Sequence, residues 1–139
     1  MGLDTTHDAW HGAYSRFHRW RVALAKAAGL PPLEIMVGFE NDRTVANVLQ
    51  WDMLKPDDLI LLLDHSDCDG ELTSEEPRRI ADRLEQLIDS PVLHEEDWHE
   101  RTLQFITGLR LAVELGESVE FQTQGQKGPF GPLPSRFGR

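Results

Sequence analysis

The chain has 139 residues, 40% of them hydrophobic, and a formal net charge of -10. That length suits one compact core, and the acidic balance argues against broad binding to nucleic acids or to anionic membranes. The single cysteine, Cys68, excludes an internal disulfide. The longest apolar runs fall far below the roughly 20 residues needed to cross a bilayer, so we expect a cytoplasmic protein without a membrane segment.

Apolar residues recur at three- and four-residue spacing from Trp10 to Ala28, which predicts a first long helix over residues 5–28. Gly29 and the two prolines that follow end this pattern. Residues 32–53 fit short helices or irregular packing. Residues 56–63 begin with a proline suited to a first helical turn and continue with an apolar run, which predicts a short buried helix.

The second half of the chain has clearer helix boundaries. Thr73 and Glu76 have the spacing of a capping box, which predicts a helix that runs to Ile88. A last helix is predicted from Trp98 to Gly116, and residues 118–121 are extended in character. The 17 residues from Thr123 hold seven Gly or Pro and three basic residues, which is typical of a flexible tail.

These elements predict a mainly α fold. We expect a single compact helical domain over residues 1–122, with an EF-hand-like helix–loop–helix and one short C-terminal strand, followed by a flexible Gly/Pro-rich basic tail over residues 123–139.

The acidic segment between the two central helices resembles a calcium loop with Gly70 as its obligatory glycine. Alternate carboxylates on a tight turn supply the hard oxygen ligands that calcium or magnesium prefers, and zinc is less suited to them. His65 stands where the first carboxylate is expected, and Asp64 is its substitute if the loop enters one residue longer. The alternative is a metal-free turn held by side-chain-to-backbone hydrogen bonds. The predicted metal ligands are Asp64, His65, Asp67, Asp69, Glu71 through its carbonyl, Thr73 and Glu76.

A second group of candidate residues lies on the predicted first helix. Its histidines and tyrosine recur at i, i+4, i+7 and i+11, which places them on one stripe beside aromatic and arginine side chains. Such a face suits a phosphate-bearing small molecule with a stackable ring, whereas the ordinary interpretation is that it only flanks the core. The predicted ligand-binding residues are His7, Trp10, His11, Tyr14, Arg16, His18 and Arg19.

Residues 3–17, LDTTHDAWHGAYSRF, and 65–72, HSDCDGEL, resemble the two signatures of a family of small, uncharacterised proteins of tailed phages and actinobacteria. The resemblance covers about residues 1–122 and carries no established activity. It implies an accessory protein of a phage or prophage, with a role in countering host defence.

Three functions follow as hypotheses. The first is a non-enzymatic protein with a divalent-metal-binding loop. The second is a binding or sequestering protein for a small phosphorylated or nucleotide ligand, or for a host defence protein, on the histidine face. The third, a metal-dependent hydrolase using His7, His11 and the acidic loop, is disfavoured because no pair of base and nucleophile is identifiable. We also expect the buried central helix to bring the acidic loop toward the histidine face, which would make one joint site.

Overall fold

An antiparallel sheet of four strands forms one side of the molecule in the computed structural model, which describes residues 2–39, 48–67 and 69–123. The sheet order is β2-β1-β4-β3, so the first and last strands of the chain lie at its centre. The strands are β1 (Gly2–Thr5), β2 (His11–Ala13), β3 (Glu71–Leu72) and β4 (Val119–Thr123). The prediction of a mainly α fold with one strand is therefore wrong, and the fold is α+β.

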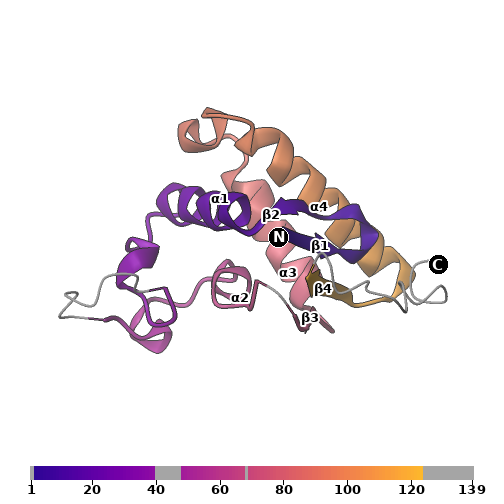
Figure 1. Ribbon diagram of the computed structural model, residues 1–139, viewed down its shortest axis with the longest axis horizontal. Helices are drawn as coiled ribbons and strands as arrows, with labels where there is room; N and C mark the ends of the chain where they lie inside the picture. The colour runs from indigo at the N-terminus through magenta and orange to yellow at the C-terminus, as the bar shows by residue number, and fades with distance from the viewer. Residues whose placement is uncertain (1, 40–47, 68, 124–139) are drawn as a thin grey trace.

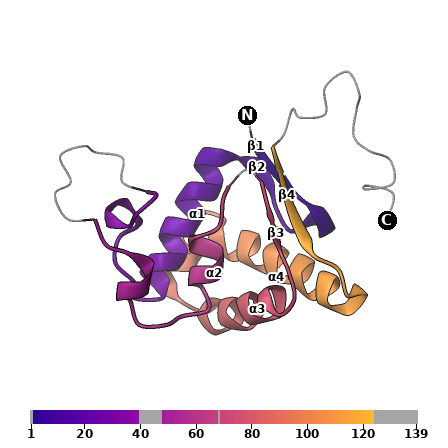
Figure 2. The same cartoon turned by 90° about the horizontal axis from the view of Figure 1, so that it is seen from below.

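Four α-helices within the described residues lie on the other side of the sheet. They are α1 (Tyr14–Ala27), α2 (Ile60–Leu63), α3 (Glu76–Leu87) and α4 (Trp98–Leu115). Short 3-10 helices cover Thr6–Asp8, Leu33–Ile35, Trp51–Met53 and Pro91–His94. Figures 1 and 2 show α3 beside α4, while the described residues between α1 and α2, 28–39 and 48–59, project away from the sheet. No helix of the described part of the chain is long and apolar enough to cross a membrane.

The N-terminal segment is a β-hairpin where the sequence predicts the start of a helix. Leu3 pairs with Gly12 on β2 and with Thr123 on β4, so β1 is held from both sides. The Thr5 amide donates to the Trp10 carbonyl over 2.9 Å, and the Trp10 amide donates to the Thr5 hydroxyl over 2.8 Å, which closes the hairpin. The helical periodicity gave a wrong prediction, because pairing of Leu3 with Thr123, 120 residues away, places the start of the chain in the sheet.

Aromatic side chains join this hairpin to the helices. Trp10 is fully buried and stacks on Trp20 of α1 at a ring-centroid distance of 5.1 Å. Trp20 contacts Phe105 of α4 at 4.9 Å, and Phe17 of α1 meets Phe121 of β4 at 6.1 Å. Because these rings come from all parts of the chain, their burial stabilises the hairpin, α1, α4 and β4 as one core.

Several predicted elements are confirmed. Helices α3 and α4 lie where capping and periodicity place them, and Gly116 ends α4 with a φ of 69°. Strand β4 contains the predicted extended residues and continues to Thr123. Thr123, which the sequence assigned to the tail, therefore belongs to the sheet. The rest of the predicted tail, residues 124–139, lies outside the described residues.

The closest approach between α4 and the hairpin occurs at Gly108. A Cβ atom on this residue would lie 2.6 Å from the Ala9 Cβ and 2.7 Å from the Ala9 Cα. We predict that Gly108→Ala lowers the free energy of unfolding by about 1–3 kcal/mol, because overpacking outweighs the roughly 1 kcal/mol that alanine gains in helix propensity. Urea unfolding measures this change.

The neighbouring exposed residue supplies the control, since Thr107→Ala should change stability by less than about 0.5 kcal/mol. A stabilised Gly108→Ala protein would contradict the close contact.

Candidate functional site

The acidic loop is a fixed connection between α2 and the sheet. It turns at Gly70, whose φ of 84° lies in the left-handed region that favours glycine. The Phe121 amide donates to the Gly70 carbonyl over 2.9 Å, and β3 pairs with β4 directly after the turn. The Thr73 amide donates to the Glu76 carboxylate over 2.9 Å, which is one half of the predicted capping box.

His65 lies inside this loop, with its ring against Phe121 at a centroid distance of 4.2 Å. Both ring nitrogens face backbone carbonyl oxygens: Nδ1 is 2.7 Å from that of Ser66, and Nε2 is 3.1 Å from that of Glu71. The first and seventh positions of the predicted calcium loop are therefore bonded to each other.

The other predicted metal ligands do not converge either. The Glu76 carboxylate accepts from the Thr73 amide, and the side chains of Asp64 and Asp69 are exposed. Among residues 2–39, 48–67 and 69–123, no three His, Cys, Asp or Glu side chains are grouped so that they would hold a metal ion. As arranged here, these residues do not fit a metal cage, and the metal site stays a prediction.

The predicted histidine stripe is divided between separate networks, since residues 5–13 form a hairpin with one 3-10 turn and not an α-helix. The ring of His7 is nearly buried and bridges the Thr6 hydroxyl and the Glu117 carboxylate, each at 2.8 Å. His11 lies between Asp4 and Asp8, each at 2.9 Å. Burial lowers the pKa of His11, but its hydrogen bonds to the two carboxylates and their charges outweigh this, and the pKa is raised. Trp10, predicted to bind a ligand, is a core residue.

The predicted phosphate-binding arginines are already paired. Arg16 donates to Glu96 at 2.9 Å and to Asp97, and its guanidinium lies 4.5 Å from the centre of the Trp98 ring. Arg19 lies 3.8 Å from Glu96. Because these carboxylates neutralise them, the two arginines offer little attraction to a phosphate group.

Tyr14 and His18, the remaining two predicted ligand residues, do share a pocket. It has a volume of about 330 Å³ and lies between α1, the segment after α1 and the acidic loop. The lining residues are Tyr14, Ser15, His18, Gly38, Phe39 and Asp67. One residue of the acidic loop, Asp67, therefore lines the same pocket as His18 of α1, while the joint site itself stays a prediction.

The rings of His18 and Phe39 define one side of this pocket. They lie 5.9 Å apart and are nearly parallel, at 21°. Burial and the charge of Arg21 lower the pKa of His18, although Asp67 and Glu34 oppose this shift. The lowered pKa favours the neutral imidazole of His18. The pocket combines three flat rings, two hydroxyls and one carboxylate.

Arg21 lies behind the pocket and holds its two walls together. It is 2% exposed, and its Nη1 donates to the carbonyls of Leu62, Leu63 and His65 over 3.3, 3.3 and 2.7 Å. The guanidinium is also sandwiched between the Phe17 and Phe39 rings, at 4.6 and 4.9 Å. Burial lowers its pKa to about 10, which leaves it charged at neutral pH.

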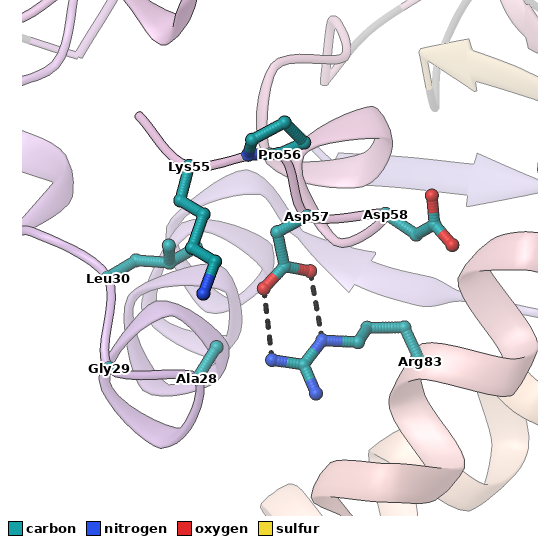
Figure 3. Close-up of a pocket in the computed structure, with 8 residues that line it drawn as sticks. All are labelled: Ala28, Gly29, Leu30, Lys55, Pro56, Asp57, Asp58 and Arg83. Atoms are coloured by element: carbon teal, nitrogen blue, oxygen red, sulfur yellow. Dashed lines mark hydrogen bonds and ion pairs between the residues drawn. The ribbon is translucent and has the colours of Figure 1, made fainter. Parts of the chain in front are cut away.

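A second cavity, of about 510 Å³, opens at the end of α1 (Figure 3). Its walls are the residues that follow α1, the residues that precede α2, and Arg83 from α3. Arg83 donates to both carboxylate oxygens of Asp57, each over 2.9 Å. This cavity contains none of the residues that the sequence singled out as metal or ligand contacts.

Sequence reasoning missed Arg21 and Phe39. A signal for Arg21 was present, because it occupies the i+4 position after Phe17 and so falls on the apolar face of α1. Phe39 gave no comparable signal, since its segment has no regular periodicity. Comparison of the chain with protein-family models, with curated proteins and with solved structures gave no match.

The packing of Arg21 leads to a stability prediction. We expect Arg21→Met to lower the free energy of unfolding by about 3 kcal/mol, because it leaves buried carbonyls without a donor. Arg19→Met removes the same charge from an exposed position of the same helix and should change stability by less than about 0.5 kcal/mol. Equal losses in the two variants, measured by chemical denaturation, would contradict this role of Arg21.

Proposed function

We propose that this is a non-catalytic binding protein that captures a small planar ligand of the nucleoside class in the pocket between α1 and the acidic loop. The observation that carries the proposal is the convergence of His18 and Asp67, which come from segments 49 residues apart, on one cavity beside the Phe39 ring. A volume of about 330 Å³ is at the small end of the range for ligand pockets.

The lining chemistry supports a heterocyclic base more than a phosphate. Flat rings such as those of Phe39 and His18 stack on any nucleic-acid base, and each such stack contributes about 1–3 kcal/mol of binding free energy. The Asp67 carboxylate accepts hydrogen bonds from ring N–H and amino groups, and guanine presents two such donors side by side. No arginine lines the pocket, because the Arg21 guanidinium is occupied by the carbonyls behind it.

The arrangement gives less support to a hydrolase. His7 and His11 belong to separate networks, and no hydrogen bond joins Ser15 to His18 within the described residues. The described geometry thus offers neither a shared metal site nor a nucleophile held by a base. A binding protein also agrees with what the family resemblance implies, namely a small accessory protein of a phage or prophage with a role in countering host defence.

A ligand panel tests the proposal. We expect guanosine to raise the melting temperature and to bind in calorimetric titrations, with inosine weaker because it lacks the 2-amino donor. Asp67→Asn should weaken guanosine binding by about tenfold or more, since a hydrogen bond to a charged group is worth roughly 1.5–3 kcal/mol.

The matched control for this variant is Asp69→Asn, which removes an exposed carboxylate from the same loop but outside the pocket. It should leave guanosine binding unchanged. Equal losses for the two variants, or the absence of any thermal shift with the nucleoside panel, would refute the proposal.

The metal-binding loop is the second candidate function. It is favoured by the left-handed turn at Gly70 and by Asp67 and Asp69, whose side chains have no ion-pair partner within the described residues. We predict that calcium or magnesium, if bound, produces heat in titrations that Asp69→Ala abolishes and that His65→Asp increases, because this substitution adds the missing first carboxylate. A titration without heat or thermal shift would remove this candidate. Substitutions of Asp69 thus distinguish the two candidate functions, since metal binding requires this side chain and nucleoside binding does not.

A further inference from the structure

The cavity at the end of α1 has a charge arrangement that the proposed function does not use. Figure 3 shows the Lys55 side chain extending between Leu30 and the Asp57–Arg83 ion pair. The apolar surface comes from Ala28, Leu30 and Pro56. The cavity therefore combines apolar surface with charged groups.

Lys55 is the cation of this cavity that is available to a ligand. Every arginine within the described residues has a carboxylate or carbonyl partner, whereas Lys55 and Lys26 have no ion-pair or hydrogen-bond partner there. Both Asp57 and Asp58 are occupied, by Arg83 and Arg79 respectively. These carboxylates therefore do not neutralise Lys55.

We propose that this cavity binds a small organic carboxylate, with its carboxylate group on Lys55 and its apolar body against Leu30 and Pro56. Counting Arg79, three cationic and two anionic side chains surround the cavity, which leaves one positive charge for the ligand to balance. The site is separate from the nucleoside pocket, and the two sets of lining residues have no member in common.

Two features select a single negative charge. The cavity lies at the C-terminus of α1, where the helix dipole opposes negative charge, so a doubly charged ligand is disfavoured more strongly than a monoanion. The whole chain also carries a net charge of -10, which disfavours a doubly charged ligand. A monoanion satisfies Lys55 without adding an uncompensated charge, and the apolar wall favours an aromatic or branched aliphatic carboxylate over acetate.

Benzoate and benzamide are suitable probes, because they have nearly the same shape and differ in charge. We expect benzoate to shift the backbone amide resonances of Gly29, Leu30 and Lys55 in NMR titrations of the full-length protein, and benzamide to bind at least tenfold more weakly. Inorganic phosphate should also bind at least tenfold more weakly than benzoate. Equal binding of benzamide would refute the ion pair, and equal binding of phosphate would refute the preference for a monoanion.

Two lysine variants locate the site. Lys55→Gln should reduce benzoate binding at least tenfold while the melting temperature stays unchanged, because the side chain is exposed. Lys26→Gln, which removes the other lysine without an ion-pair partner in the described part of the chain, lies in the last turn of α1 and should leave benzoate binding intact. Equal effects of the two variants would show only general attraction to positive charge and would overturn the proposal. Guanosine binding should be unaffected by either substitution, so failure at one pocket is distinguishable from failure at the other.

Discussion

The buried guanidinium of Arg21 is the interaction on which the arrangement of this molecule depends. A charged group 2% exposed is costly unless it is hydrogen-bonded. The Arg21 Nη1 obtains acceptors from the carbonyls at the end of α2 and the start of the acidic loop, whereas its Nε has no partner among the described residues. These carbonyls lie at and just after a helix C-terminus, where backbone donors are scarce, although that of Leu62 also accepts from the His65 amide over 3.3 Å. One side chain of α1 thus compensates for a helix end that is far away in the sequence and holds the acidic loop against α1.

This attachment explains why the candidate pocket exists. With the loop fixed on α1, Asp67 lies across from Tyr14 and His18, and Phe39 covers the outer face of the Arg21 guanidinium. Burial, together with the charge of Arg21, lowers the pKa of His18, which favours its neutral form beside the Asp67 carboxylate. Structural support and ligand chemistry therefore come from the same contact, and the residue that organises the pocket does not line it.

The acidic loop also shows how a calcium-loop pattern is accommodated by hydrogen bonds within the protein. His65 bonds to the Glu71 carbonyl, Glu76 caps its own helix, and β3 pairs with β4 rather than with a second loop. Each of these contacts uses a group that a bound cation would otherwise attract. The alternative interpretation of the sequence, a turn held by hydrogen bonds, describes the observed loop better than the metal cage does.

Local patterns in the sequence determined α3, α4, the glycine turn and the final strand, because capping, periodicity and backbone restrictions act within a few residues. Local patterns failed for residues 5–13, where Trp10 had helical spacing but pairing of β1 with β4 decided the conformation. They identified Tyr14, His18 and Asp67 as unusual without showing that these side chains meet. Only the tertiary structure decided that, because their proximity depends on Arg21 binding carbonyls more than 40 residues away, and backbone acceptors leave no mark in a sequence.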